Sequence, residues 1–181
     1  VLFRSNNVGM IGGAVYAESL IGLRFISCTF DSNMAQSEGF DNYGGGAVMI
    51  VDSPFYSKDN FLSVVDCVFW KNSARRAGGA ISIGGWHHVY MRIDRSTFLE
   101  NSAQYATELG RGGALYLFHS YNCSLDVTES VFQSNDADAG GGLFMGSIYG
   151  GVQFYGNRFS MNKATRSGSA AAFVSFLDPN D

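Results

Sequence analysis

The amino-acid sequence predicts an all-β fold, a right-handed parallel β-helix (solenoid) of about five to six rungs, each rung being one coil of the chain. Three observations predict it. A Phe-x-x-Asn pair recurs six times in 181 residues, a Gly-Gly-Ala motif or a close variant follows each pair, and apolar residues alternate around both motifs. Successive Phe residues are 27, 39, 29, 34 and 27 positions apart, a period that is typical of stacked repeats.

The Phe-x-x-Asn pairs give the first short strand and the bend after it. We expect each Phe to point inward and to stack on the Phe one coil away. Each Asn should lie at the bend, where its side chain can bond the backbone and tolerates left-handed conformations. Stacked Asn side chains can also bond one another as a ladder. The members of this predicted ladder are Phe3/Asn6, Phe30/Asn33, Phe69/Asn72, Phe98/Asn101, Phe132/Asn135 and Phe159/Asn162.

Glycine motifs follow the Asn residues and predict a tight corner without a Cβ clash. The distance from Asn to the first Gly is six residues in four of the six copies and longer in the other two. The motifs are Gly12-Gly13-Ala14, Gly45-Gly46-Ala47, Gly78-Gly79-Ala80, Gly112-Gly113-Ala114, Gly141-Gly142-Leu143 and Gly168-Ser169-Ala170.

After the glycines, a second strand is predicted, with an inward column followed by an outward one. The inward column is Val15, Val48, Ile81, Leu115, Phe144 and Ala171. The next residues are a mixed set that suits an outward face: Tyr16, Met49, Ser82, Tyr116, Met145 and Ala172.

A third strand is predicted before each Phe, from apolar residues seven and five positions ahead of it. The minus-seven column is Leu23, Leu62, Met91, Leu125 and Val152, and the minus-five column is Phe25, Val64, Ile93, Val127 and Phe154. A bend at pairs such as Asp66 and Asp94-Arg95 should separate this strand from the Phe. One coil cannot bury its inner face alone, so the coils must stack in parallel, about 4.8 Å apart.

We expect one β-helix repeat domain over residues 1–181, as a piece of a longer protein without complete caps. Residues 1–5, VLFRS, are also what a common sequencing adaptor encodes in one frame, so our hypothesis is that they are not native. Phe3 nevertheless fits the repeat, and the coding DNA of an independent clone tests the hypothesis. Open solenoid ends expose unpaired strands, which predicts end-to-end self-association.

Composition argues against several classes of protein. Hydrophobic residues make up 46% of the chain, which is too apolar for a disordered protein. The formal net charge is −4 and there is no basic run, so we expect no nucleic-acid partner. No apolar stretch reaches the roughly 20 residues of a transmembrane helix, so no membrane span is expected in this segment.

Phe-x-x-Asn followed by Gly-Gly-Ala-(Ile/Leu/Val) resembles the repeat of the chlamydial polymorphic outer membrane proteins. The resemblance runs from Phe3 to about Phe173. It implies a right-handed, pectin-lyase-like β-helix that is exported by an autotransporter and displayed as an adhesin. The implied location is extracellular or at the cell surface. The implied partner is a protein or glycan on a host or neighbouring cell.

Three longer segments predict protruding loops, at residues 35–44, 51–60 and 103–111. The first and third leave the same corner two coils apart, with a dip between them. Aromatic and charged side chains around such a groove suit sugar binding, although surface loops also vary freely without function. The residues of this predicted ligand groove are Glu38, Phe40, Asp41, Tyr43, Arg75, Arg76, Tyr105, Glu108 and Arg111.

Two classes of function remain open, beside a plain structural spacer. The first is a non-enzymatic interaction module that presents loops to a partner, and the sequence favours it. The second is a polysaccharide-binding or polysaccharide-degrading domain. A glycoside hydrolase needs two carboxylates about 5.5 Å or 6.5–9.5 Å apart, and Glu38 or Asp41 with Glu108 is the pair that we nominate. No catalytic residue, metal site or cofactor is otherwise predicted.

The cysteines and one glycosylation pattern complete the candidates. Cys28 and Cys67 share a column in adjacent coils, and we favour free buried thiols over a disulfide. The three cysteines of the chain have no metal-binding spacing. Asn122-Cys123-Ser124 is an N-glycosylation acceptor pattern at Asn122.

Overall fold

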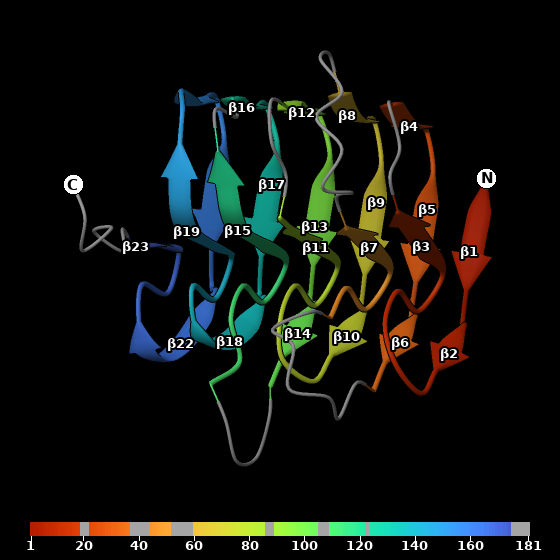
Figure 1. Cartoon of the computed structure of the whole chain (residues 1–181). Coiled ribbons are helices and arrows are strands. Elements are labelled where there is room, and N and C mark those ends of the chain that lie inside the picture. The colour runs from red at the N-terminus through yellow and green to blue at the C-terminus, as the bar shows by residue number, and fades with distance from the viewer. Residues whose placement is uncertain are drawn as a thin grey trace.

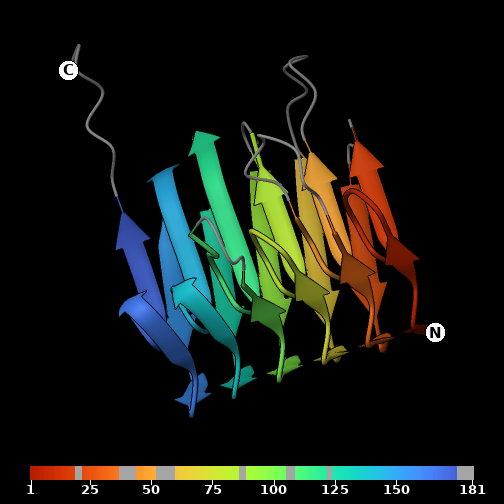
Figure 2. The ribbon, with the colours of Figure 1, turned by 90° about the horizontal axis from the view of Figure 1, so that it is seen from below.

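The computed structural model describes residues 1–18, 22–36, 44–51, 60–85, 89–104, 109–121 and 124–174. These residues form strands joined by turns and bends, and contain no helix. The strands make four parallel sheets in which each strand pairs with its counterparts one coil before and one coil after. The coils follow one another in chain order from the N-terminus to the C-terminus (Figures 1 and 2). The predicted parallel β-helix is therefore confirmed.

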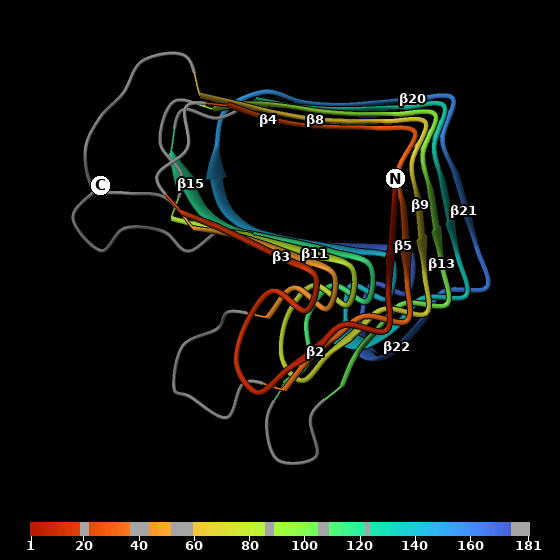
Figure 3. The same ribbon diagram turned by 90° about the vertical axis from the view of Figure 1, so that its right-hand side faces the viewer.

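Figure 3 looks along the axis of the coil with the N-terminal coil nearest the viewer. The chain runs clockwise as it recedes, so the coil is right-handed. One turn passes through four sheets, which we call A, B, C and D in chain order. The hand agrees with the usual hand of parallel crossovers.

Sheets A and B hold the short strands on either side of the Phe-x-x-Asn bend. Sheet A consists of β1 (Leu2–Arg4), β5 (Thr29–Asp31), β9 (Val68–Trp70), β13 (Thr97–Leu99), β17 (Val131–Gln133) and β21 (Arg158–Ser160). Sheet B consists of β2 (Asn7–Val8), β6 (Met34–Ala35), β10 (Ser73–Ala74), β14 (Ser102–Ala103), β18 (Asp136–Ala139) and β22 (Lys163–Ser167).

Sheets C and D hold the longer strands that follow the glycine corner. Sheet C consists of β3 (Val15–Glu18), β7 (Val48–Val51), β11 (Ile81–Gly84), β15 (Leu115–Tyr121), β19 (Leu143–Tyr149) and β23 (Ala171–Val174). Sheet D consists of β4 (Gly22–Ile26), β8 (Asn60–Val65), β12 (Val89–Asp94), β16 (Ser124–Thr128) and β20 (Val152–Tyr155).

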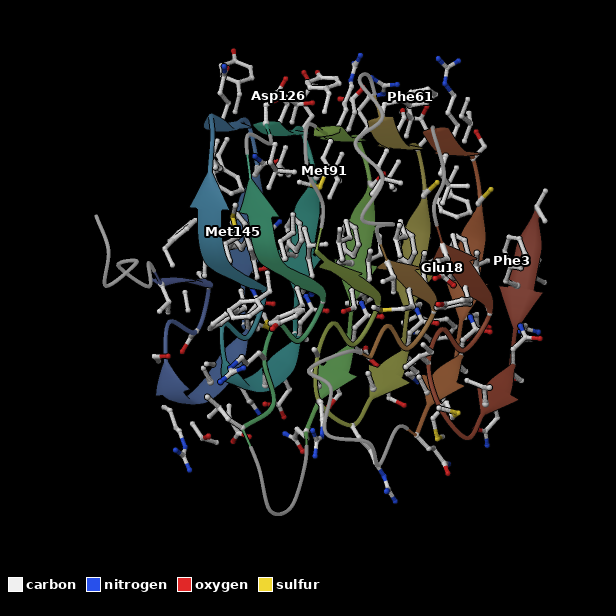
Figure 4. All side chains as sticks on the ribbon, viewed as in Figure 1. Phe3, Glu18, Phe61, Met91, Asp126 and Met145 are labelled. Carbon is white, nitrogen blue, oxygen red and sulfur yellow. The ribbon has the colours of Figure 1, made fainter. Side chains whose placement is uncertain are left out.

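The core lies inside the coil, between the four sheets. The predicted inward columns of sheet D stack in register, from Leu23 to Val152 and from Phe25 to Phe154. In the central coils these side chains are buried, together with the Phe residues of sheet A. Met91 and Met145 lie on the inner side of the ribbon, whereas Phe61 and Asp126 rise from the outer side of sheet D (Figure 4).

The glycine corner of the fifth coil lies one residue earlier than the sequence analysis placed it. Leu115 pairs with Leu143, so the inward residue after the corner is Leu143 and the outward one is Phe144. The residue that corresponds to Gly112 is therefore Gly140, and both have positive φ, 66° and 64°. The run Gly140-Gly141-Gly142 offers two possible pairs, and only the pairing with the neighbouring coil identifies the right one.

The outer face of sheet C is mostly buried, although the sequence analysis expected it to face outward. Met49, Ser82 and Tyr116 are fully buried and Phe144 nearly so, while Tyr16 in the first coil is 47% exposed. A second hydrophobic cluster lies there, formed by Ala77, Tyr116, Ala139, Phe144 and Ala172, with Leu109 and Phe118 packed against it. Residues of the corner between sheets B and C thus cover the beginning of sheet C from outside.

Two columns of residues with positive φ make the bends on either side of sheet A. The first lies before the Phe strand and includes Ser27, Asp66 and Arg95. The second lies directly before each Asn and includes Ser32, Lys71, Glu100 and Ser134. The predicted bends at Asp66 and Arg95 are therefore present. The left-handed residue at the other bend is the one before Asn, so Asn itself is free to place its amide inside the coil.

Candidate functional site

The Asn residues form a continuous hydrogen-bonded ladder inside the coil. From Asn33 to Asn162, each Asn side-chain oxygen accepts the backbone N–H of the preceding Asn, at 3.0 or 3.1 Å, and also the side-chain Nδ2 of that Asn. Each Nδ2 in this range also donates to the carbonyl oxygen of a Phe one coil back, as Asn72 does to Phe30 at 2.9 Å. Asn33, Asn72, Asn101 and Asn135 are fully buried.

Asn162 takes its predicted place in the ladder and is the last Asn of the ladder in the described part of the chain. Its side-chain oxygen accepts the N–H and the Nδ2 of Asn135, at 3.0 and 2.9 Å, and its Nδ2 donates to the carbonyl of Phe132 at 2.8 Å. No further Asn follows it among the residues that the structure describes, so its amide has no ladder partner there on the other side. Asn162 is therefore half-buried and bonded to one neighbouring Asn, whereas the four central Asn residues are fully buried between two.

The Phe residues form a stack beside the Asn ladder. Neighbouring rings from Phe3 to Phe159 have centroids 4.6–4.9 Å apart and are nearly parallel, with interplanar angles of 3–5°. This spacing is the distance between adjacent parallel strands. The Phe and Asn ladders therefore hold the coils together, and the ladder side chains of the central coils are buried and not available to a ligand.

The second internal column contains the two cysteines. Cys28 and Cys67 are both free and buried. The backbone N–H of Cys28 donates to Cys67 Sγ at 3.4 Å, and that of Cys67 donates to Ser96 Oγ at 3.1 Å. Burial raises the pKa of the Cys67 thiol. These side chains therefore replace backbone acceptors at the bend before each Phe, and Cys67 is kept in its protonated form.

Most residues of the predicted loop groove lie outside the described part of the chain. This holds for Glu38, Phe40, Asp41, Tyr43, Tyr105 and Glu108, and so for both members of the nominated carboxylate pair. Asn122, the glycosylation candidate, also lies outside it.

The three arginines of the predicted groove are described, and they have different surroundings. Arg75 lines a shallow hollow of about 180 Å³ on the outer face of sheet B. Arg76 is only 6% exposed, so little of it is open to a ligand. Arg111 is half-buried, with its guanidinium 5.6 Å from the centre of the Phe144 ring. Arg111 is therefore associated with the outer cluster of sheet C, and Arg76 is buried rather than open to a groove.

The outer face of sheet D carries a group of exposed polar and aromatic side chains that the sequence analysis did not single out. Arg24, Ser63, Arg92 and Asp126 lie in register in one outward column, with Gln153 after them. Phe61 and Tyr90 are neighbours in the adjacent outward column. The same alignment on Phe contained the signal, because these columns stand six and eight residues before each Phe.

A hollow of about 320 Å³ lies on this face, over the second coil. It is lined by Arg24, Ile26, Phe61, Leu62, Ser63, Tyr90 and Arg92. Ser63 stands between Arg24 and Arg92 in its column, and its short side chain leaves the space between the two longer ones. We call this feature the sheet D hollow.

A charged network borders the sheet D hollow on the side of the next bend. Asp94 is 3% exposed and accepts hydrogen bonds from Thr128 Oγ1 at 2.6 Å and from Arg92 at 3.0 Å, and it also pairs with Arg95. Arg95 in turn forms a two-point ion pair with Asp66, at 2.9 and 3.1 Å. The hydrogen bond from Thr128, helped by both arginines, lowers the pKa of Asp94. Asp94 therefore fixes Arg92 at the edge of the hollow.

Tyr90 is held in place by the next coil. Its hydroxyl donates to Asp126 Oδ2 at 2.7 Å, and this bond, with partial burial, raises the pKa of the phenol. Tyr90 is 45% exposed, so its ring forms part of the wall of the hollow.

The part of the chain that the structure describes holds neither a metal-binding cluster nor a membrane helix. No three His, Cys, Asp or Glu side chains there are grouped so that they could hold a metal ion. Within the same ranges there is also no helix long and apolar enough to cross a membrane. No protein-family model, curated protein or solved structure matches the chain.

Proposed function

We propose that the chain is a non-enzymatic, adhesin-like β-helix module of the extracellular space or cell surface, which presents loops to a partner on another cell. The partner is a surface protein or a glycan. The observation that carries the proposal is that the repeat residues serve the interior of the coil. Phe and Asn of every coil are occupied in internal ladders, so the differences between coils that a partner can reach lie at the corners and outer faces.

The positions of the longer segments support this proposal. The chain between β6 and β7 and the chain between β14 and β15 leave the same corner, between sheets B and C. The two coils are separated by the coil of β10, whose corner is short. A rigid rod that carries longer segments at one corner is suited to recognition, since binding residues are often placed on loops held by a regular scaffold.

The resemblance of the repeat to that of the chlamydial polymorphic outer membrane proteins supports the location. If the source organism displays this chain, antibodies raised against the purified 181-residue chain will label intact cells without permeabilisation. Labelling that requires permeabilised cells would contradict the surface location and leave an intracellular scaffold.

The presentation of loops is tested by binding to cultured cells. Purified chain coupled to fluorescent beads should bind cells, and a variant with residues 35–44 trimmed to the short corner of the third coil should lose most of that binding. A second variant with residues 52–59 shortened, which keeps Val51 of β7 and Asn60 of β8, tests the corner between sheets C and D separately. Equal binding by all three proteins, with unchanged circular dichroism, would reject the first corner as the recognition site.

A further inference from the structure

The sheet D hollow has a cationic wall on each side of a small residue. Arg24 and Arg92 are on strands β4 and β12, with Ser63 of β8 between them. Two strand spacings separate the arginines, roughly 9.6 Å along the coil axis. A group that lies over Ser63 is therefore within reach of both guanidinium groups and of the Ser63 hydroxyl.

The two arginines line the hollow and retain hydrogen-bond donors. Arg24 forms no ion pair within the described ranges, and its guanidinium lies 4.8 Å from the centre of the Phe61 ring. Arg92 has a side chain that is 50% exposed, and one of its terminal nitrogens, Nη2, bonds Asp94. An arginine has five N–H donors in a fixed planar fork, which suits carboxylate and sulfate groups.

The aromatic side of the hollow determines which shape of ligand fits. Phe61 and Tyr90 lie next to one another in the adjacent outward column, and the hydrogen bond from Tyr90 to Asp126 fixes the second ring. Apolar rings beside a few placed polar groups are the usual lining of small-molecule sites. A pyranose ring fits this lining, because its C–H face packs on aromatic rings while its substituents hydrogen-bond.

We propose that the sheet D hollow binds an acidic sugar residue. The carboxylate or sulfate of the sugar lies over Ser63, between Arg24 and Arg92, and the sugar ring packs beside Phe61 and Tyr90. Asp126 continues the same column past Arg92 and repels a second anion there. The site therefore selects an oligosaccharide with separated acidic groups over a dense polyanion.

This site is separate from the corner between sheets B and C, which lies across the coil from sheet D (Figure 3). The inference does not rest on the presentation of loops to a partner. Trimming of residues 35–44 leaves the hollow unchanged, and changes in the hollow leave that corner unchanged.

The test is isothermal titration calorimetry of the purified chain with defined tetrasaccharides. One contains glucuronate and no sulfate, one contains sulfate, and one is a neutral N-acetylglucosamine tetrasaccharide. We expect binding of at least one acidic tetrasaccharide, with Kd at least tenfold lower than for the neutral one. Which acidic sugar binds identifies the anion. Equal affinity for the neutral sugar, or no binding of either acidic sugar, would overturn the proposal.

Three variants locate the site. Arg24→Gln should raise Kd for the acidic sugar at least tenfold, and Ser63→Trp, which fills the hollow, should abolish binding. Arg158→Gln, an exposed arginine in the outward column of sheet A, is the matched control and should change Kd less than twofold. If Arg24→Gln binds as tightly as the parent chain while circular dichroism shows both folded, the sugar binds elsewhere and the proposal is wrong.

Discussion

At the scale of single residues, internal side chains accept hydrogen bonds from backbone N–H groups that have no strand carbonyl as a partner at the bends. The N–H of Asn33 follows a residue with a φ of 55° and donates to Asn72 Oδ1 rather than to a strand carbonyl. At the other bend, Cys67 Sγ and Ser96 Oγ accept backbone N–H groups in the same way. A buried N–H that loses its partner is costly, which explains why these positions carry an acceptor in every coil.

Replacement of Asn72 by Ala should therefore be strongly destabilising. The change leaves the N–H and Nδ2 of Asn33 and the carbonyl of Phe30 without their bonds to Asn72. We expect a loss of about 2–5 kcal/mol in the free energy of unfolding, measured by urea denaturation. Asn6→Ala is the control, because Asn6 is exposed and water can replace its bonds. Equal losses for the two variants would show that burial of the ladder is unimportant.

The carboxylate of Asp94 predicts a pH dependence of stability. Its pKa is lowered from the ordinary value of 3.8 by the bond from Thr128 and by the two arginines, so the folded chain holds this proton less tightly than the unfolded chain. The stabilisation is fully present above the unfolded pKa and is lost as pH falls through the lower, folded pKa. Urea denaturation should show Asp94→Asn destabilised at pH 7, with the difference from the parent chain shrinking below about pH 4.

Glu100→Gln serves as the control for that experiment. The Glu100 side chain is 47% exposed, and its Oε2 lies 3.7 Å from Lys71 Nζ. Exposed pairs of this kind contribute about 0–1 kcal/mol. A pH-independent difference between Asp94→Asn and the parent chain would mean that packing, not ionisation, explains the effect of the substitution.

At the scale of elements, the corner between sheets B and C depends on close contact of backbones. A Cβ on Gly79 would lie 2.1 Å from the carbonyl oxygen of Gly113 and 2.5 Å from the amide nitrogen of Ser102. A Cβ added to Gly46 would likewise lie 2.1 Å from the carbonyl oxygen of Gly79, and one added to Gly113 would lie 2.1 Å from that of Gly141. The glycines are therefore needed for the approach of one coil to the next, in addition to the positive φ of the residue before them.

Gly79→Ala should therefore lower the free energy of unfolding by more than about 4 kcal/mol, or prevent folding, because the obstructing atoms are backbone atoms. Gly151→Ala is the matched control, since nothing lies within 4 Å of the added Cβ. Thermal denaturation followed by circular dichroism compares the two. A Gly79→Ala protein with the stability of Gly151→Ala would reject the close packing of this corner.

The elements also show why the sequence predicts some features and not others. The columns of sheet D and the Phe and Asn positions follow from spacing, because parallel stacking places identical positions on top of one another. The position of the corner in the fifth coil does not follow from spacing, because the run from Gly140 to Gly142 satisfies two alignments. The burial of Tyr116 and Phe144 does not follow either, since their cover comes from Ala77 and Ala139 on a different segment.

The candidate site was missed for a related reason. Alignment of the coils reveals what repeats, and the inward residues repeat. A binding face is made of outward residues that differ from coil to coil, such as Arg24, Ser63 and Arg92, and their significance depends on the chemistry of neighbours rather than on a pattern. The ligand groove was predicted at the longer loops because they interrupt the period, but most of its residues lie outside the described part of the chain.

At the scale of the whole molecule, each coil contacts only the coil before it and the coil after it. A solenoid of this kind should accept the removal of one complete coil, provided that the register is kept. Deletion of residues 70–98 removes one repeat of 29 residues and joins Phe69 directly to Leu99, which restores Phe-x-x-Asn with Asn101. Ala35 would then pair with Ala103, as equivalent positions of the same column.

We expect this deletion variant to fold, with a β-sheet circular dichroism spectrum. The slope of its unfolding free energy against urea concentration should fall by about one sixth, in proportion to the surface that unfolding exposes. Deletion of residues 71–98 is the control, because it differs by one residue and produces Phe-x-x-x-Asn. A slip of one residue turns every side chain of a strand to the opposite face, so this variant should unfold or aggregate. If both variants fold equally well, internal register does not determine the stability of the rod; if neither folds, the coils are not interchangeable units.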